Sequence, residues 1–355
     1  MMPHLAVQSK PQDICVVRLS AIGDTCHALA VVRRLQDNWP DARITWIIGK
    51  TEASLMSEIS DIEFIVFDKS KGRHAYDEVR VELKGRNFDV ALCMHASMRV
   101  NLLCRAIPTA VRLGFDRARA RDFQWLFTNY RIPAAENEHA LEAMMSFATT
   151  IGAKSTPLRW DLPLSSQATG YAARFEDCRR PVVVISPCSS QRSRNFRNWS
   201  VDNYAVIVRH LQQEHGCTVV LTGGRSNLET EYGDKLCRAA DREIIDLIGK
   251  SSLQELAAVI KTADLVICPD SGPAHVATAV GTPVIGLYAT SNPARTGPYL
   301  SRDLTVSRYD EAVRQYLGKD SSALRWGTRV RHPDAMDLIT IDDVRGKIDG
   351  FLGKK

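Results

Sequence analysis

The stretch from residue 265 to residue 288 constrains the fold of this chain most. It contains two apolar runs, 265–268 and 284–288, separated by the polar turn Asp270-Ser271-Gly272 and a short segment of helical character. Apolar runs bounded by turn residues are typical of parallel strands covered on both faces. Open α/β sheets bind ligands at the carboxyl ends of such strands. The stretch therefore predicts a ligand-binding turn in an α/β domain.

The helix after this turn is expected to begin at Pro273, because proline is favoured at the first helical position. The free N–H groups of its first turn would favour an anion, so the turn predicts a seat for a phosphate or a sugar. A second interpretation stays open. Asp270 and Ser271 can act as capping residues only, and His275 can be an ordinary buried histidine of the core.

The pattern of alternating strands and helices occurs on both sides of a break in the chain. Residues 154–169 contain Pro157, Pro163 and several Ser and Thr but no long periodic run, which predicts a linker. Strands are expected at 14–19, 43–48, 64–67, 90–95, 111–115, 182–186, 218–222, 243–247, 265–268 and 284–288. Helices are expected at 25–37, 76–86, 98–106, 138–150, 201–215, 228–240, 253–262, 274–280 and 341–352. A further helix is expected to start at about residue 51.

Strands that alternate with helices indicate βαβ units and parallel sheets. We therefore predict an α/β fold of two Rossmann-like, doubly wound domains that face a cleft. The N-terminal domain is expected at residues 1–165 and the C-terminal domain at 170–330. Residues 331–355 are expected to form a closing helix that packs back on the N-terminal domain.

Composition excludes several classes of protein. The 355 residues are 45% hydrophobic and 25% charged, as in soluble globular proteins. The net charge of +5 is too small to imply nucleic-acid binding. Residues 1–13 lack the apolar core of a signal peptide, and no apolar run approaches the ~18 residues of a membrane helix. The nine dispersed cysteines form no C-x-x-C pair, which favours reduced thiols in a cytosol over disulfides or a zinc site.

The first polar motif is the segment 20–27, which follows the first expected strand and contains Gly23, Asp24 and His27. Asp24 lies at a helix start, where a capping role of ~1 kcal/mol is the simplest explanation. The functional alternative is a general base. The segment lacks G-x-G-x-x-G, which argues against an ordinary dinucleotide site.

Two further loops follow strands of the second domain. Residues 186–199 include Ser189 and three arginines without an acid, Arg192, Arg194 and Arg197, which indicates either an oxyanion-binding loop or a solvated basic loop. After the turn at residues 222–224, Glu229 can accept hydrogen bonds from sugar hydroxyls, or can simply stabilise the first turn of a helix.

Positive charge is concentrated in the first domain. Residues 69–131 hold thirteen Lys or Arg and six Asp or Glu, an excess of 13 − 6 = +7 that includes Lys69, Arg73 and Arg121. The region is either a solvated surface or a binding face for an acidic partner, such as an anionic glycolipid or a membrane surface. The sequence 249–251 resembles the end of a P-loop, but Ile244 replaces its first glycine, so we reject a Walker A site. No metal-binding motif is present.

Taken in order, these motifs resemble the family-9 glycosyltransferases, in particular the ADP-heptose:lipopolysaccharide heptosyltransferases. The segments that carry the resemblance are 20–27, 197–199, 223–229, 249–253, 270–275 and 290–299. The resemblance implies a GT-B fold with the donor in the C-terminal domain. It also implies inverting, metal-independent transfer of L-glycero-D-manno-heptose from ADP-heptose to the Kdo region of the lipopolysaccharide inner core, without a cofactor.

The resemblance also implies roles for single residues. Asp24 matches the catalytic base, and Arg197 stands where family members often carry Lys. Arg121 resembles an acceptor-binding arginine of the first heptosyltransferase. The donor-binding residues expected are Ser189, Arg197, Glu229, Ser251, Asp270, Ser271, Gly272 and His275. The acceptor-binding residues expected are Gly23, His27, Lys69, Arg73 and Arg121.

The implied partners are a nucleotide-sugar donor, an anionic Kdo-lipid A acceptor and the inner face of the cytoplasmic membrane, to which a cytoplasmic protein would bind peripherally. No nucleic-acid partner is expected. Three alternatives remain open. They are heptosyltransferase II or another family-9 transferase, a GT-B nucleotide-sugar epimerase, and a non-catalytic nucleotide-sugar binding protein.

Overall fold

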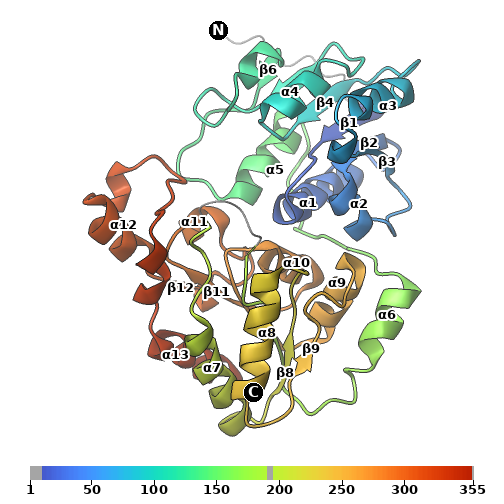
Figure 1. Cartoon of the computed structure of the whole chain (residues 1–355). Coiled ribbons are helices and arrows are strands. Elements are labelled where there is room, and N and C mark those ends of the chain that lie inside the picture. The colour runs from blue at the N-terminus through green and yellow to red at the C-terminus, as the bar shows by residue number, and fades with distance from the viewer. Residues whose placement is uncertain (1–9, 190–194, 354–355) are drawn as a thin grey trace. The chain divides into compact units, whose positions relative to one another are not determined.

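The computed structural model describes residues 10–189 and 195–353 (Figure 1). The chain divides into two compact units, Met1–Pro163 and Leu164–Lys355, and the division falls inside the segment predicted as a linker. Each unit is built on one six-stranded sheet in which all neighbouring strands are parallel, with helices alternating between the strands. The α/β prediction of two Rossmann-like units is confirmed.

The first sheet has the strand order β3-β2-β1-β4-β5-β6. Its central strand β1 pairs with β2 and β4, and Ile14 lies opposite both Ile44 and Val90. Because both faces of the sheet are covered, the apolar run of β1 is fully buried. The strands are β1 (Asp13–Val17), β2 (Arg43–Gly49), β3 (Glu63–Phe67), β4 (Val90–Cys93), β5 (Arg112–Gly114) and β6 (Tyr130–Arg131). The helices are α1 (Ile22–Asn38), α2 (Lys50–Leu55), α3 (His74–Glu82), α4 (Met98–Cys104) and α5 (Ala140–Thr150), with the 3-10 turns η1 (Lys69–Lys71) and η2 (Gln124–Leu126).

The second sheet repeats this order as β9-β8-β7-β10-β11-β12. Its strands are β7 (Val182–Ile185), β8 (Thr218–Leu221), β9 (Ile245–Asp246), β10 (Leu265–Pro269), β11 (Val284–Tyr288) and β12 (Val306–Ser307). Its helices are α6 (Ser166–Ala173), α7 (Val201–Gln213), α8 (Asn227–Ala239), α9 (Leu253–Thr262), α10 (Gly272–Val280), α11 (Pro293–Thr296), α12 (Tyr309–Leu317) and α13 (Ile341–Leu352). The predicted strands and helices are present in both units, whereas the short elements β6, α6, α11, β12 and α12 were not predicted.

The topology fixes where polar loops gather in each unit. The strand order reverses between β1 and β4 in the first sheet and between β7 and β10 in the second. Loops that leave the carboxyl ends of these strand pairs diverge, and open α/β sheets bind ligands in the resulting crevice. The functional residues of each unit are therefore expected at the carboxyl edge of its sheet.

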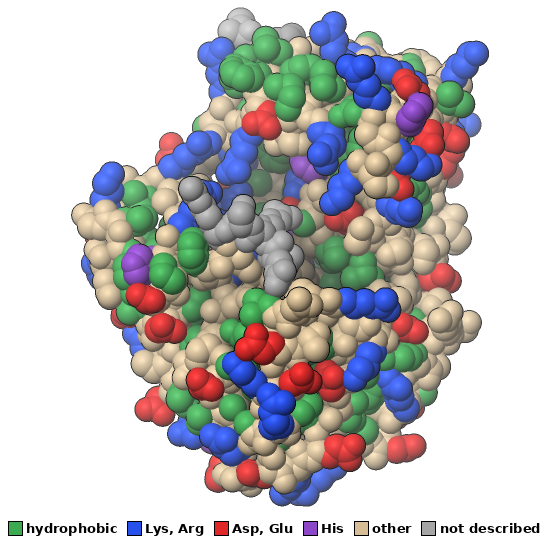
Figure 2. Space-filling model, in the orientation of Figure 1, with side chains coloured by type: hydrophobic (Ala, Val, Ile, Leu, Met, Phe, Trp, Pro, Cys, Tyr) green, Lys and Arg blue, Asp and Glu red, His purple; other side chains and the backbone are tan. Residues whose placement is uncertain are grey.

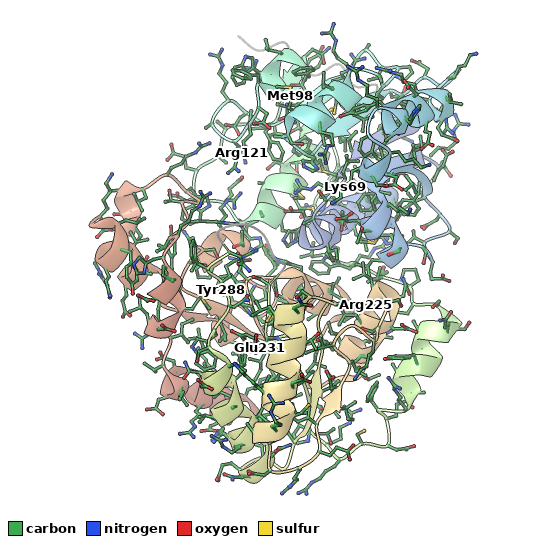
Figure 3. The ribbon with its side chains drawn as sticks, viewed as in Figure 1. Lys69, Met98, Arg121, Arg225, Glu231 and Tyr288 are labelled. Atoms are coloured by element: carbon green, nitrogen blue, oxygen red, sulfur yellow. The ribbon has the colours of Figure 1, made fainter. Side chains whose placement is uncertain are left out.

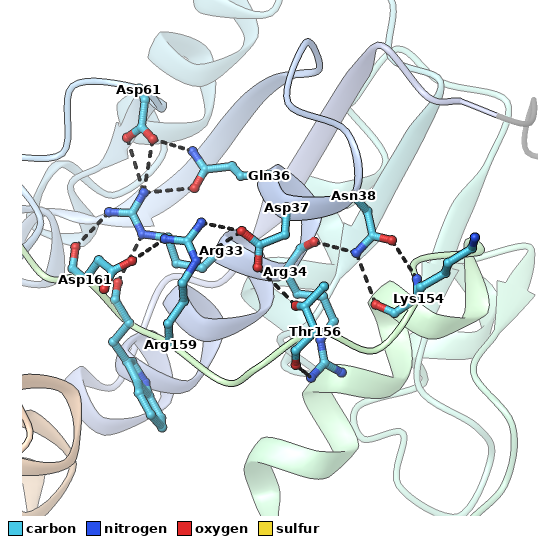
Figure 4. A network of polar contacts seen from close by, with 11 residues as sticks. Arg33, Arg34, Gln36, Asp37, Asn38, Asp61, Lys154, Thr156, Arg159 and Asp161 are labelled. Atoms are coloured by element: carbon cyan, nitrogen blue, oxygen red, sulfur yellow. Dashed lines mark hydrogen bonds and ion pairs between the residues drawn. The ribbon is translucent and has the colours of Figure 1, made fainter.

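Much of the predicted linker is hydrogen-bonded to helix α1 of the first unit. The backbone N–H of Lys154 donates to Asn38 Oδ1 (2.7 Å), and the Arg33 Nε donates to the carbonyl of Trp160 (3.0 Å) (Figure 4). The indole of Trp160, itself buried, donates to the carbonyl of Cys26 (2.9 Å). These bonds fix residues 154–161 along α1 as part of the first unit. Residues 166–169, also predicted as linker, instead begin α6, which packs on α9.

The closing helix α13 forms where it was predicted but packs differently. It contacts α7, β11 and β12, and its residues Val344, Ile348 and Leu352 belong to the second unit's hydrophobic core. We expected this helix to pack on the N-terminal domain, whereas its apolar face is used to complete the second unit. No helix in the described residues has the length and apolarity that crossing a bilayer requires.

Candidate functional site

Asp24 lies at the carboxyl edge of the first sheet, in the first turn of α1. Its carboxylate forms an ion pair with Arg18 and accepts the N–H of Ala21 at 3.4 Å. The capping interpretation is therefore met, though by a long hydrogen bond. The Asp24 side chain is 37% exposed and that of Arg18 only 11%. A solvent-accessible carboxylate held by a buried guanidinium is compatible with the second interpretation, a general base.

Arg18 and His95 connect the two strands at the switch point of the first sheet. Arg18 Nη1 donates to the carbonyl of Met94 at 2.6 Å, and the N–H of Leu19 donates to His95 Nδ1 at 3.3 Å. Burial, together with the positive charge of Arg18, lowers the pKa of His95 to about 4, so its imidazole is neutral at neutral pH. The sequence interpretation missed both residues, although each lies at or next to the end of a predicted strand.

A second carboxyl group lies close to this position. Glu52 is 9% exposed, and burial raises its pKa above the ordinary value, against the opposing charges of Lys69 and Arg18. The backbone of Gly49 leaves room for this approach, since a Cβ there would lie 2.4 Å from the Leu19 carbonyl oxygen and 2.6 Å from Glu52 Oε2. The edge thus combines an exposed acid, a buried acid and a buried cation.

The expected acceptor residues divide into two groups. His27 is only 2% exposed and its ring packs edge-to-face on His139, with centroids 5.5 Å apart, and Gly23 is buried in the same helix. The surroundings of His27 are those of a core histidine. Lys69, Arg73 and Arg121 are instead exposed on the segments that follow β3 and β5, and so lie at the carboxyl edge. Figure 3 labels two of them, Lys69 and Arg121. None of these three side chains forms an ion pair with another described residue.

Four other cations of the basic region are neutralised locally, so the solvated-surface interpretation applies to these four. The four paired side chains are Lys71 (with Glu78), Arg80 (with Asp77), Arg86 (with Glu63) and Arg119 (with Asp116 and Glu138). Figure 2 shows Lys and Arg side chains spread over the visible face of the first unit, among apolar, acidic and neutral groups. Ion pairs thus involve four of the thirteen Lys and Arg of this region.

Arg197 and Asp270 are joined at the switch point of the second sheet. Arg197 Nη1 donates to the carbonyl of Asp270 at 2.8 Å and lies 3.6 Å from its carboxylate. Asp270 is 6% exposed and accepts a hydrogen bond from Ser291 at 2.8 Å, with Arg329 4.0 Å away. The sequence interpretation counted Asp270 among the donor-binding residues and missed Ser291 and Arg329. In the structure Asp270 positions Arg197.

Ser189 organises the loop that carries Arg197. It is 1% exposed, and both its N–H (2.9 Å) and its hydroxyl (3.1 Å) donate to Asn198 Oδ1. The next residue, Trp199, is fully buried and donates to the Ile339 carbonyl at 3.0 Å. These contacts anchor both sides of Arg197. Arg192 and Arg194 of the same loop lie outside the described residues.

The N-terminus of α10 lies beside Arg197. The helix begins at Gly272, one residue before the predicted start, and the side chain of its N-cap residue, Ser271, makes no cap hydrogen bond. The Ser271 hydroxyl donates backward to the Pro269 carbonyl at 3.1 Å, so it does not occupy the first-turn amides. His275 is buried on the same helix, at 8% exposed. The first-turn amides and the Arg197 cation form an electropositive position suited to an anion.

Glu229 serves its own helix. It accepts hydrogen bonds from the N–H of Gly224 (2.6 Å) and the hydroxyl of Ser226 (2.5 Å), and completes a capping box at the start of α8. The simpler interpretation of Glu229 is thus realised. Arg225 donates to the Gly249 carbonyl at 2.8 Å and so joins this turn to the loop that carries the half-buried Ser251. The predicted donor residues therefore lie on the loops that follow strands of the second sheet or at the start of the helices after those loops.

Known proteins share this architecture and sequence. The chain matches glycosyltransferase family 9 (heptosyltransferase) over residues 77–326. It is similar to the lipopolysaccharide core heptosyltransferase OpsX of Haemophilus influenzae, with 38% identity over 95% of this chain and 96% of the relative. It is also similar to lipopolysaccharide heptosyltransferase 3 of Escherichia coli, with 28% identity over 76% of this chain and 80% of the relative.

Two solved structures share the fold. One is a family-9 glycosyltransferase from Veillonella parvula, with a TM-score of 0.78, 20% identity, and coverage of 98% of this chain and 99% of that one. The other is E. coli heptosyltransferase WaaC with ADP, with a TM-score of 0.74, 18% identity, and coverage of 95% and 99%. The fold is GT-B, and the family match covers well over half of the sequence. The chain belongs to glycosyltransferase family 9, the heptosyltransferase family.

Proposed function

We propose that this protein transfers L-glycero-D-manno-heptose from ADP-heptose to the Kdo region of the lipopolysaccharide inner core, with inversion and without a catalytic metal. The observation that carries the proposal is Arg197, anchored by Asp270 beside the uncapped N-terminus of α10. This arrangement suits the diphosphate of a nucleotide sugar. The names of the relatives support lipopolysaccharide core as the acceptor.

The donor is held by the second unit in this proposal. The departing ADP gains negative charge as the glycosidic bond breaks, and a cation and helix amides already in place stabilise it without reorganisation. Arg197 and the amides of Ser271 and Gly272 supply these groups. Glu229 and Ser251 bind the nucleoside of ADP-heptose in this proposal. Glu229 does so from the turn that carries its carboxylate, and Ser251 through its backbone.

The acceptor is activated by the first unit. Asp24 removes the proton from the acceptor hydroxyl while that oxygen attacks the anomeric carbon from the face opposite ADP, which inverts the configuration. Arg18 holds the carboxylate and is itself fixed by the Met94 carbonyl. Neutral His95 adds no positive charge beside the base at neutral pH.

The acceptor is anionic in this proposal, and the exposed Lys69, Arg73 and Arg121 attract it. The region around Arg121 also exposes apolar side chains. Met98 and Leu102 on α4, with Phe123 and Leu126 around η2, are 40%, 50%, 56% and 68% exposed. The Met98 N–H donates to the carboxylate of Asp122 at 2.9 Å, so the two segments are adjacent.

We name Met98, Leu102, Phe123 and Leu126 the apolar patch. Exposed basic residues lie near it along the chain, namely Arg99, Arg105, Arg117 and Arg121. Apolar groups beside cations bind the interface of an anionic membrane. We propose that this patch holds the protein peripherally on the cytoplasmic face of the membrane that carries the acceptor.

Turnover with defined acceptors tests the proposal. The protein is incubated with ADP-heptose and Kdo-lipid A, with or without a phosphate on Kdo, or with the product of a first heptosyl transfer, and products are identified by mass. Addition of one heptose to Kdo-lipid A is the expected result. Addition only to the already heptosylated acceptor would assign the second transfer instead.

Reactions with donor alone separate the other two alternatives. An epimerase would convert the nucleotide sugar without an acceptor, and a binding protein would bind it and form no product whether or not an acceptor is added. Either result contradicts the proposed transfer.

A further inference from the structure

Two histidines and an aspartate converge on the second unit, away from the donor loops. His210 Nε2 and His215 Nε2 each lie 2.7 Å from the same oxygen, Asp349 Oδ1. The two imidazoles are nearly perpendicular, with centroids 5.4 Å apart. One ligand atom from each of the three residues lies within 4.8 Å of the other two. We call these three residues the His-His-Asp cluster.

The cluster is built by segments far apart in the chain. His210 lies in the last turn of α7, and His215 follows two residues after the helix ends, where Gly216 adopts a positive φ of 62° that turns the chain toward β8. Asp349 comes from α13, which packs against α7 (Figure 1). The side chains of His210 and His215 are only 12% and 15% exposed, so most of their rotational freedom is already lost.

We infer that the His-His-Asp cluster is a structural binding site for a divalent transition-metal ion of the zinc type. Two imidazoles and one carboxylate are ligands that Zn²⁺, Co²⁺ and Ni²⁺ favour, whereas Mg²⁺ and Ca²⁺ favour oxygen alone. A tetrahedral ion with bonds of about 2.0–2.1 Å needs ligand atoms about 3.3 Å apart. The two distances to Asp349, 2.7 Å each, reach that spacing if the imidazoles withdraw by less than about 1 Å. The two imidazole nitrogens, which lie within 4.8 Å of each other, must come to the same spacing.

The position of the cluster decides its role. A helix that follows a parallel strand runs back along the sheet, so the end of α7 lies at the edge opposite to Arg197 and Asp270. An ion here would therefore take no part in sugar transfer. It would join α13 to α7 and hold the closing helix on the core. This role is independent of the proposed function, which needs no catalytic metal.

Binding of Co²⁺ and Zn²⁺ to the full chain tests the inference. The protein is prepared without a polyhistidine tag and stripped with a chelator. Co²⁺ is then titrated while its visible absorption is recorded, and the thermal midpoint is measured with and without Zn²⁺. The expected result is one Co²⁺ per chain with the intense absorption of low coordination number, and a midpoint raised by several degrees in Zn²⁺.

Three variants locate the ion. His215→Asn removes a ligand and is expected to weaken Co²⁺ binding by more than about tenfold. Asp349→Asn keeps an oxygen that can hydrogen-bond to the two imidazoles but loses the anionic ligand. It is therefore expected to weaken Co²⁺ binding while α13 stays folded. His332→Asn is the control, because His332 also lies near a carboxylate, that of Asp334 at 3.7 Å, but outside the cluster. Its binding is expected to equal that of the wild type.

Two results would overturn the inference. One is a wild-type chain that binds neither ion at millimolar concentration, which would make the cluster a hydrogen-bonded contact only. The other is Co²⁺ binding that His215→Asn and Asp349→Asn leave unchanged. Heptosyl transfer measured in parallel is expected to be the same with and without Zn²⁺ below the thermal midpoint, so failure of the metal site leaves the proposed function unaffected.

Discussion

The guanidinium of Arg197 donates a hydrogen bond to the main-chain carbonyl of Asp270 at 2.8 Å and lies 3.6 Å from its carboxylate. This pair joins the loop after β7 to the turn after β10, the two segments at the switch point of the second sheet. A buried carboxylate therefore fixes the direction of the cation that we assign to the donor diphosphate.

Removal of that cation is expected to weaken the transition state. Arg197→Ala should lower kcat/KM for ADP-heptose by about 100-fold, the usual effect of losing one group that stabilises developing charge. Arg197→Lys should lose less, since the charge remains. Arg238→Ala, an exposed arginine in the last turn of α8, is the matched control and should behave as wild type. Steady-state kinetics at varied ADP-heptose concentration measure these changes. A kcat/KM equal to that of the wild type in Arg197→Ala would refute the assignment.

The proposed base is tested by separating binding from turnover. Asp24→Ala is expected to bind ADP-heptose with nearly unchanged affinity in calorimetry and to lose transfer by about 100-fold or more, since general-base catalysis contributes 10²–10⁴ in rate. Near-full turnover in this variant would show that another group accepts the proton.

Arg18 is a positioning residue for Asp24, and its effect is expected in kcat. Arg18→Ala should lower kcat about tenfold with little change in KM for the donor, and Arg18→Lys should restore part of the loss. A purely structural role would reduce the amount of folded protein and leave kcat per folded molecule unchanged. The control is Arg43→Ala, which breaks the exposed ion pair with Asp13 in the same unit and should leave kcat unaltered.

The lowered pKa of His95 predicts that the folded protein loses stability in mild acid. Its folded pKa of about 4 lies below the ordinary 6.5, so between these values the unfolded chain binds a proton that the folded chain does not. Stability should therefore fall as pH falls from about 6.5 to about 4, by roughly 2–3 kcal/mol in total from this residue. Urea unfolding of wild type and His95→Asn at several pH values isolates the effect. Equal pH dependence in the two proteins would contradict the assignment.

The contact between Trp199 and the segment before α13 is expected to stabilise the second unit. Trp199→Ala should cost about 3–5 kcal/mol, because it empties a fully buried site. Trp199→Phe should cost about 1–2 kcal/mol, mainly by leaving the Ile339 carbonyl without its donor. Urea unfolding followed by circular dichroism measures both changes. Trp125→Phe, at a partly exposed tryptophan of the first unit, is the control and should change stability least.

The apolar patch is tested with vesicles. Phe123→Ser combined with Leu126→Ser is expected to lower co-flotation with anionic vesicles severalfold, because two exposed apolar side chains no longer enter the interface. High salt should weaken wild-type binding by screening the surrounding arginines. Leu300→Ser is the control, since Leu300 is 59% exposed on the other unit. Equal flotation of the double variant and the control would exclude the patch.

Local pattern was sufficient for the main elements of this chain. The apolar runs of β10 and β11 and the 3.6-residue periodicity of α9 predict those elements within one residue of their observed ends, since burial on both faces of a parallel sheet imposes these patterns directly. The two-residue strands β6 and β12 could not be predicted, because they are too short to show a period and exist only through pairing with β5 and β11.

Among the candidate site residues, the sequence alone placed Asp24, Arg197 and Ser271 after the carboxyl ends of strands. It could do so because an apolar strand followed by a polar turn is a local signal. Only the tertiary structure showed that Asp24 is paired with Arg18, that Asp270 serves Arg197, and that Glu229 is used by its own helix cap. It also placed His27 in the core and α13 on the second unit. Apart from the Asp24–Arg18 pair and the capping box of Glu229, which are local, these outcomes depend on contacts between residues far apart in the chain, such as Arg197 and Asp270, 73 positions apart. Such contacts leave no period or motif in the sequence, since they arise when separate segments pack together.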